Sequence, residues 1–202
     1  EGFDKTRVDD TYWSLVEAGL GSVIVEYGSD IQHTSGFPVQ NGPELQSRDM
    51  ESHEEGKDGS IASSPWNLNN IPRSKDSLLE YVQENVAGVT SPWVYAGMLF
   101  STFCFHVEDN WLYSLSYNHM GAAKRWYAIP AKKAEHFEGA IRDLVPELYK
   151  RKHSLFLQAL LTMVSPATLQ SKGVEVFEAR QEPGEFIVTF PRAYHGGFNE
   201  GR

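Results

Sequence analysis

Residues 97–109 read Gly-Met-Leu-Phe-Ser-Thr-Phe-Cys-Phe-His-Val-Glu-Asp, and this stretch carries the strongest signal for the fold. Its aromatic and apolar run is typical of a β-strand, and it ends in His106, Val107 and Glu108. In a strand, residues i and i+2 point to the same face, so this spacing presents an imidazole and a carboxylate together. The stretch therefore predicts a strand that ends in two ligands of a metal site.

A third ligand candidate, His195, follows an independent strand candidate by a few residues. A 2-His-1-carboxylate facial triad binds non-haem Fe(II) and leaves positions open for a cosubstrate and O₂. Taken alone, a His-x-Glu in a strand is more often a surface or satisfied polar pair, at roughly nine to one. The surrounding sequence therefore has to decide between a catalytic metal site and an ordinary polar pair.

The second half of the chain alternates strand candidates with a helical stretch. Short β-branched or aromatic runs bounded by Gly or Pro are typical of strands. Apolar residues recur at helical spacing from Pro130 to about Gln170, with a break near His153 and a second helix from Leu155 to Met163. We expect strands over residues 93–105, 112–117, 125–129, 174–180 and 185–190. Strands on both sides of a helical insert predict a mainly β fold with helices (α+β), as a barrel or jelly roll.

The N-terminal half gives weaker signals. Apolar spacing predicts a helix around residues 8–16 and an amphipathic helix over residues 74–86, with a β-branched strand over residues 22–27 between them. Residues 40–64 contain almost no apolar side chains, so we expect a mobile surface loop there. A length of 202 residues suits a single domain spanning residues 1–202, and the start at Glu1 suggests a truncated fragment.

Composition narrows the possible partners. The chain has 27 acidic and 18 basic residues, a formal charge of -9 and a pI near 5.2. This charge disfavours direct contact with nucleic acid and suits a basic partner such as a Lys/Arg-rich peptide tail. Cys104 is the single cysteine, which excludes an internal disulfide and a cysteine-based zinc site. There is no long apolar run, so no membrane partner is expected.

A cation is needed if the site binds an α-keto acid such as 2-oxoglutarate, because the distal carboxylate of that molecule needs a partner. Lys124 lies in a strand candidate beside Trp126 and Tyr127, where a solvated charge would be the ordinary interpretation. Arg202 is the alternative, since it follows the second histidine by a short distance. We favour Lys124, because no strand is predicted around Arg202.

Three ordered blocks of this sequence resemble the JmjC histone lysine demethylases. They are residues 97–109, residues 113–130, which include Tyr113-Ser114-Leu115-Ser116-Tyr117 and Lys124-Arg125-Trp126-Tyr127-Ala128-Ile129-Pro130, and residues 184–195, Gly-Glu-Phe-Ile-Val-Thr-Phe-Pro-Arg-Ala-Tyr-His. Residues 26–30, 36–39 and 66–69 make the chain most similar to the JARID subfamily, which acts on lysine 4 of histone H3. The resemblance covers about residues 23–201 and implies a double-stranded β-helix, the cupin-like jelly-roll core of that family, with flanking and inserted helices.

The resemblance also implies a role for individual residues. His106, Glu108 and His195 match the catalytic iron ligands, and Lys124 matches the partner of the 2-oxoglutarate carboxylate. Tyr95, with Trp93 near it, corresponds to an aromatic residue beside the methylated lysine, where a ring favours a methylammonium cation. Without the resemblance, both would be interpreted as core residues. Positions that line the cosubstrate pocket are matched by Tyr27, Phe103, Ser114, Ser116, Trp126 and Asn199.

Several positions depart from the family pattern. Ser116 stands where an asparagine is usual near the cosubstrate, so its hydrogen bond would be shorter in reach or bridged by water. Phe105 replaces a tryptophan and Asn110 replaces a histidine. The chain stops at Arg202, before the strand that closes the family barrel. Cys104 is expected to be a small buried hydrophobe and not a ligand.

These observations predict an Fe(II)- and 2-oxoglutarate-dependent dioxygenase that removes methyl groups from histone lysine, with di- or trimethylated lysine 4 of histone H3 as substrate. The resemblance implies iron as the cofactor and 2-oxoglutarate and O₂ as cosubstrates. The resemblance places such a protein in the nucleus, where it would meet the methylated histone H3 tail and join chromatin complexes through regions outside this chain. Two alternatives stay open, namely a JmjC protein hydroxylase and a catalytically silent recruitment module.

Overall fold

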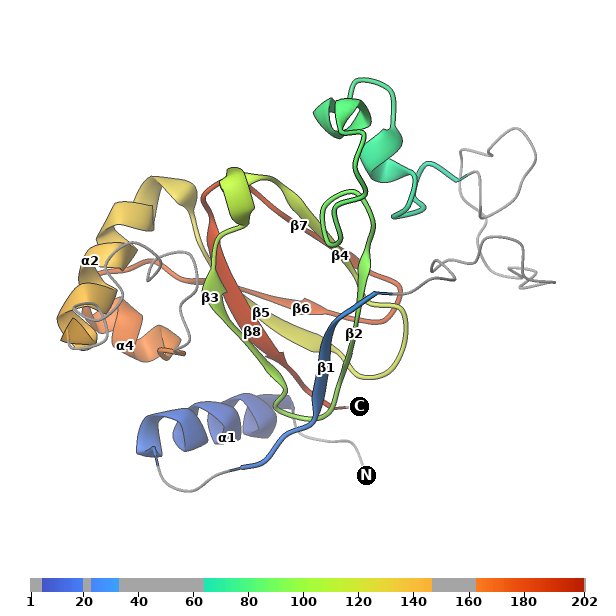
Figure 1. Cartoon of the computed structure of the whole chain (residues 1–202). Coiled ribbons are helices and arrows are strands. Elements are labelled where there is room, and N and C mark those ends of the chain that lie inside the picture. The colour runs from blue at the N-terminus through green and yellow to red at the C-terminus, as the bar shows by residue number, and fades with distance from the viewer. Residues whose placement is uncertain (1–4, 20–22, 33–63, 147–162, 202) are drawn as a thin grey trace. The chain divides into compact units, whose positions relative to one another are not determined.

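The computed structural model describes residues 5–19, 23–32, 64–146 and 163–201 (Figure 1). The chain forms two compact units. One comprises residues 1–26 and 97–202, and the other comprises residues 27–96. The first unit contains all three residues of the expected metal site.

The first unit is built on two antiparallel sheets. The larger sheet has the strand order β3-β8-β5-β6, and the smaller sheet pairs β4 with β7. The strands are β3 (Thr102–His106), β4 (Ser114–Tyr117), β5 (Lys124–Ile129), β6 (Phe177–Gln181), β7 (Phe186–Thr189) and β8 (Tyr194–Asn199). Neighbours in the larger sheet are far apart in sequence, which is the non-sequential pairing expected of a jelly roll.

The register of the larger sheet places the chemistry-bearing residues side by side. His106 at the end of β3 lies opposite His195 in β8, after an irregularity in the pairing between Phe103 and His106. In the same sheet, Lys124 at the start of β5 lies opposite Asn199 of β8 and Gln181 of β6. The strand pairing itself therefore brings together residues separated by up to about ninety positions in the chain.

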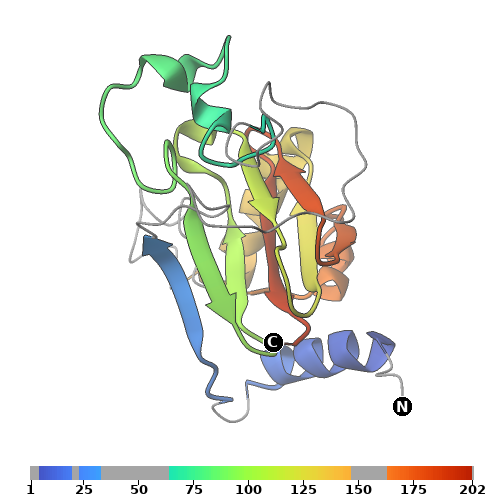
Figure 2. The same cartoon turned by 90° about the vertical axis from the view of Figure 1, so that its right-hand side faces the viewer.

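In the described part of this unit, three helices cover the sheets. They are α1 (Lys5–Ala18), α2 (Ala134–Leu144) and α4 (Pro166–Ser171), with short 3-10 turns at η4 (Asp109–Trp111) and η5 (Ala131–Lys133). Both α2 and α4 lie against the same face of the larger sheet, away from β4 and β7 (Figures 1 and 2). Phe137 and Ile141 of α2 and Leu169 of α4 are fully buried in a core shared with Phe105 and Ile129 of the sheet. Burial of these side chains stabilises the sheet from behind.

The second unit contains a two-stranded sheet of β1 (Tyr27–Gln32) and β2 (Trp93–Gly97). Among residues 64–96 it also contains the 3-10 turns η2 (Ile71–Arg73) and η3 (Leu78–Tyr81). Ser77 caps η3, since its hydroxyl accepts a hydrogen bond from the backbone N–H of Leu79. Among the described residues no helix is both long and apolar enough to cross a membrane.

The predicted fold class, mostly antiparallel β with a few helices in a jelly roll, is confirmed. Two local predictions are wrong, and one strand was missed. The strand expected at residues 22–27 begins only at Tyr27, and Ile24 is 84% exposed. The helix expected over residues 74–86 is reduced to the turn η3, and its Leu78 is exposed. The strand β8, which contains His195 itself, was not predicted, because its residues Gly196 and Gly197 weaken the strand signal.

Two other predictions lie on residues outside the described ranges. The expected helix over residues 155–163 falls almost entirely within 147–162, and the expected loop over residues 40–64 falls within 33–63 except for its last residue. Both stay predictions. The N-terminal helix is confirmed as α1, with Val8 and Tyr12 buried on one face.

Candidate metal centre

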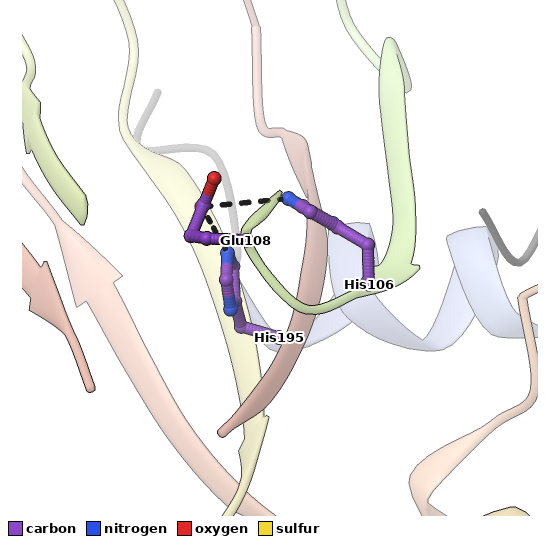
Figure 3. A group of neighbouring side chains, drawn as sticks. All are labelled: His106, Glu108 and His195. Carbon is purple, nitrogen blue, oxygen red and sulfur yellow. Dashed lines mark hydrogen bonds and ion pairs between the residues drawn. The ribbon is translucent and has the colours of Figure 1, made fainter. Parts of the chain in front are cut away.

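His106, Glu108 and His195 converge in the first unit (Figure 3). His106 is the last residue of β3, Glu108 lies on the turn that follows, and His195 belongs to β8. His195 Nε2 lies 3.2 Å from Glu108 Oε1, and His106 Nε2 lies 3.8 Å from the same oxygen. One ligand atom from each residue can be chosen so that all three lie within 4.8 Å of one another.

These separations fit one metal ion. Two ligand atoms that bind an ion at right angles, each about 2.1 Å from it, lie about 3 Å apart. The separations of 3.2 and 3.8 Å are close to that value. Two imidazole nitrogens and a carboxylate oxygen suit a divalent transition metal, and three protein ligands leave coordination positions open. The three residues therefore fit a catalytic metal better than a closed structural one.

Backbone carbonyls orient both imidazoles. His106 Nδ1 lies 2.8 Å from the carbonyl oxygen of Cys104, and His195 Nδ1 lies 3.0 Å from that of Ala193. A carbonyl can only accept, so each ring donates to it from Nδ1, and a neutral ring then directs an unprotonated Nε2 at the site. His195 donates a hydrogen bond to Glu108 only when its Nε2 also carries a proton, and metal binding displaces that proton. Such a second partner fixes the tautomer of a metal-binding histidine. The sequence could not reveal these carbonyls, because any residue type supplies one.

The electrostatics favour the metal-binding protonation states. Burial is the main cause that lowers the pKa of His106, and nearby His195 lowers it further. The hydrogen bond from His195 lowers the pKa of Glu108, and a hydrogen bond from Ser114 adds to this effect against the opposing effect of burial. Neutral imidazoles and an ionised carboxylate are the forms that bind a cation.

Strained backbone surrounds the site. Asn110 and Trp111, just after Glu108, have positive φ angles of 53° and 52°, and Arg192, just before His195, has a φ of 60°. The Arg192 guanidinium lies 5.2 Å from the Trp111 ring centroid, so a cation–π contact joins these two turns. A cavity of about 270 Å³ lined by residues 107–111 opens beside Glu108. Strain of this kind persists where the surrounding structure holds a functional site in place.

Four of the expected cosubstrate residues gather around β5 of the larger sheet. Lys124 Nζ lies 4.8 Å from the Phe103 ring centroid and 5.8 Å from that of Trp126. Phe103 and Trp126 pack edge to face, and the Trp126 ring lies 6.1 Å from that of His195. Asn199 lies opposite Lys124 across the β5–β8 pair. An aromatic-lined ammonium group therefore lies next to the metal site.

The two serines belong to β4 of the smaller sheet. Ser114 pairs with Thr189 of β7, and their hydroxyls are hydrogen-bonded to each other. Because Ser114 also bonds to Glu108, it links the smaller sheet to the metal site. Ser116 lies two residues further along β4, and its backbone oxygen accepts a hydrogen bond from Gln181. Thr189 and Gln181 were not predicted as site residues, since a buried Thr or Gln in a strand gives no signal in the sequence.

The remaining expected residues belong to the second unit. Tyr95 donates a hydrogen bond to Asp30 (2.8 Å), and its ring lies 6.1 Å from that of Tyr27. Burial raises the pKa of Tyr27 to about 12. Trp93 and Tyr95 are 38% and 46% exposed, so neither is a core residue. In the first unit, Cys104 is partly buried, which raises its pKa, and it is not part of the metal-binding group.

The JmjC family, described as JmjC domain, hydroxylase, matches residues 93–202, more than half of the sequence. The chain belongs to the JmjC family. All residues of the metal site, and all the expected cosubstrate residues except Tyr27, lie inside the matched range. The resemblance inferred from the three sequence blocks is thereby confirmed.

Curated relatives of this JmjC chain are named lysine-specific demethylases. The chain is 42% identical over 200 residues to lysine-specific demethylase JMJ17 of Arabidopsis thaliana, an alignment that covers 98% of the chain. It is 43% identical to lysine-specific demethylase 5D of Homo sapiens and 44% identical to lysine-specific demethylase 5B of Gallus gallus, in each case over 197 residues and 96% of the chain. The chain spans 16%, 12% and 12% of the length of these three relatives.

Proposed function

We propose that this JmjC chain catalyses Fe(II)- and 2-oxoglutarate-dependent demethylation of methylated lysine in histone H3, with lysine 4 as the target. The convergence of His106, Glu108 and His195 carries the proposal, because it supplies a facial set of ligands with open coordination positions. The names of the relatives support demethylation of lysine. The choice of lysine 4 depends on the resemblance of residues 26–30, 36–39 and 66–69 to the JARID subfamily.

The reaction consumes one O₂ and one 2-oxoglutarate for each methyl group. Iron, when bound, supplies the activation of O₂ for insertion of oxygen into a C–H bond. One oxygen atom enters succinate, formed with CO₂ from 2-oxoglutarate, and the other converts N–CH₃ into N–CH₂OH. The carbinolamine then loses formaldehyde, and the lysine nitrogen keeps a proton in place of the methyl group. The protein has to bind both substrates, orient them and exclude bulk water.

The residues around β5 suit 2-oxoglutarate. The Lys124 ammonium would pair with the distal carboxylate, and its position beside two packed aromatic rings strengthens that pairing by excluding water. Asn199 on the neighbouring strand β8 offers a polar partner, and the Ser114 hydroxyl on β4 of the smaller sheet offers another. Ser116 offers a third where the family has asparagine, and Tyr27 is proposed as a further hydroxyl donor. The alternative cation, Arg202, lies outside the described residues.

The proposed substrate is a basic, methylated peptide. Tyr95 and Trp93 expose aromatic surface in the second unit, and an aromatic face attracts a methylammonium cation. The formal charge of -9 favours the approach of a Lys/Arg-rich histone tail. A histone substrate places the protein in the nucleus, with chromatin complexes as partners through other regions of a longer protein.

The test is turnover by the purified chain. Loaded anaerobically with Fe(II) and then given O₂, 2-oxoglutarate and a trimethylated histone H3 peptide, the chain should release formaldehyde and succinate in equal amounts. An unmethylated peptide supplies the control. Succinate formation with an oxidised peptide that keeps its methyl groups would favour instead a side-chain hydroxylase, which the family description also permits. Absence of metal binding would favour the recruitment module.

A further inference from the structure

Gln181 is a polar side chain buried inside the first unit. It is the last residue of β6 and is only 1% exposed. Trp126 Nε1 donates a hydrogen bond to Gln181 Oε1 (2.9 Å), and Gln181 Nε2 donates to the backbone oxygens of Ser116 (3.0 Å) and Glu185 (2.9 Å). Both Nε2 protons are therefore used, and the amide orientation is fixed by its partners. A buried amide is tolerated where its hydrogen bonds are satisfied in this way.

The partners of Gln181 lie in different sheets. Trp126 belongs to β5 of the larger sheet, whereas Ser116 belongs to β4 of the smaller sheet and Glu185 immediately precedes β7. The main-chain ladders pair strands within each sheet, not between the two sheets. One side-chain amide thus fixes the spacing of the two sheets at this point. Asn118 reinforces the junction, since its Nδ2 donates to the backbone oxygen of Gln181 (3.2 Å).

The same junction borders the proposed 2-oxoglutarate pocket. The Trp126 indole held by Gln181 packs 4.7 Å from the Phe103 ring and 6.1 Å from that of His195. Lys124 is the direct partner of Gln181 in the β5–β6 register, and its Nζ lies 5.8 Å from the Trp126 ring. A rotation of the indole would therefore displace one wall of the space around the Lys124 ammonium.

We propose that Gln181 is a positioning residue for 2-oxoglutarate, acting through the Trp126 indole and the Ser116 backbone. Its amide fixes the separation of the two pocket walls, so that the Lys124 ammonium meets the distal carboxylate without rearrangement. This inference rests on the proposed function, since it concerns the cosubstrate of that same site. If Gln181 had a merely structural role, its substitution would lower the stability of the protein and leave the affinity of the folded protein for 2-oxoglutarate unchanged.

Gln181→Met tests the proposal, because methionine preserves the length of the side chain and removes all three hydrogen bonds. Binding of 2-oxoglutarate to the anaerobic Fe(II)-loaded chain is measured by calorimetry, with Gln170→Met on the exposed side of α4 as the matched control. Gln181→Met should raise the Kd of 2-oxoglutarate about tenfold, because it removes the positioning that one or two hydrogen bonds provide. The Kd of the metal should stay within about twofold, and Gln170→Met should resemble the wild type in both.

Trp126→Phe supplies a second variant, because it keeps an aromatic ring and leaves Gln181 in place while it removes the N–H donated to Gln181, together with part of the buried indole ring. It should raise the Kd of 2-oxoglutarate by about threefold, and adding Gln181→Met should then raise it less than in the wild-type background. Wild-type affinity in the folded fraction of both single variants, with only the thermal midpoint lowered, would overturn the inference. A wild-type chain that binds Fe(II) but not 2-oxoglutarate would overturn the proposed function itself and the inference with it.

Discussion

Glu108 supplies the carboxylate of the three-residue group from a turn with strained neighbours, so its position depends on the backbone around it. Glu108→Ala removes a charged ligand and should weaken metal binding by about a hundredfold or more and abolish turnover. The β-scaffold should stay folded, because the Glu108 side chain is not part of the hydrophobic core. Metal titration and circular dichroism check the two halves of this prediction. Asp109→Ala, which removes the adjacent carboxylate, is the control and should keep metal affinity within about threefold.

Lys124 is the residue on which the cosubstrate assignment depends. Lys124→Ala should raise the KM for 2-oxoglutarate about ten- to a hundredfold, since a charge-assisted hydrogen bond in a partly dry pocket contributes about 1.5–3 kcal/mol. Metal affinity should change little, because the ammonium is not a ligand. Steady-state kinetics at varied 2-oxoglutarate concentration measure the effect. An unchanged KM in Lys124→Ala together with a raised KM in Arg202→Ala would move the assignment to Arg202.

The titration of Lys124 gives an independent signature of the same role. Burial lowers the pKa of its ammonium to about 8. Below that pH the group is charged and can bind a carboxylate, and above it the free protein loses the charge. Affinity for 2-oxoglutarate should therefore be constant below about pH 8 and fall as pH rises further, by up to about tenfold per pH unit. The Lys124→Ala protein, titrated in parallel by calorimetry, should show no such fall in affinity. An equal fall in both proteins would show that a group other than Lys124 causes the pH dependence.

At the scale of elements, the N-terminal helix and most β-strands around the site were predictable, and the elements between residues 22 and 86 were not. The strands β3, β5 and β7 are rich in aromatic and β-branched residues with Gly or Pro near their ends, so local sequence suffices to locate them. The sequence around Leu78 has the apolar spacing of a helix but forms only a short turn with Leu78 exposed. Periodicity predicts a helix only where a partner surface buries the apolar stripe, and sequence does not show that surface.

The residues of the site also differ in how far the sequence predicts them. His106, Glu108 and His195 could be predicted because their chemistry is rare and the motif around them is distinctive. Gln181 and Thr189 could not, because their importance comes only from the strand pairing that sets them beside Trp126 and Ser114. The carbonyl partners of the two histidines are equally invisible in sequence. The residues that the sequence did not predict are thus those that support the metal and cosubstrate residues, because only the assembled sheets show which side chains they contact.

The strand β8 shows how an element constrains the site through its backbone. A Cβ added at Gly197 would lie 1.9 Å from the carbonyl oxygen of Arg125 in β5 and 2.7 Å from Phe103 Cζ. Gly197→Ala should therefore force β8 away from β5 and destabilise the fold by roughly 3 kcal/mol. Because His195 lies only two residues before Gly197 in β8, the same shift should displace His195 and weaken metal binding. Denaturant unfolding and metal titration measure both effects.

Gly139 in α2 is the matched control for this substitution. A Cβ there would meet nothing within 4 Å, so Gly139→Ala should stabilise the protein by about 0.5–1 kcal/mol through helix propensity. Metal affinity should stay at the wild-type value. A Gly197→Ala protein as stable as the wild type would show that the β5–β8 pair can widen without cost, and the role given to this close approach would then be wrong.

At the scale of the whole molecule, the charge of -9 makes a prediction about substrate capture. A methylated histone H3 tail is basic, so the acidic chain should attract it from a distance and speed its association. Salt screens such attraction beyond about 10 Å at 0.1 M ionic strength. The kcat/KM for the peptide should fall severalfold between about 0.05 and 0.5 M salt, while the kcat should change little because chemistry follows binding. A kcat/KM that does not change with salt would show that long-range charge attraction does not contribute to recognition of the peptide.

Specificity for one lysine is the more demanding prediction, because a general attraction to basic peptides cannot provide it. Formaldehyde release should be greatest with H3 peptides di- or trimethylated at lysine 4, and weaker with peptides methylated at lysine 9, 27 or 36. All four peptides are basic, so electrostatic capture contributes similarly to each, and any difference must come from contacts close to the methylated residue. Tyr95→Ala should therefore reduce turnover of the lysine 4 peptide, by about tenfold if a cation–π contact of 1–2 kcal/mol is lost, without changing its salt dependence. Equal turnover of all four peptides would leave the dioxygenase chemistry in place and place its substrate selection outside this chain.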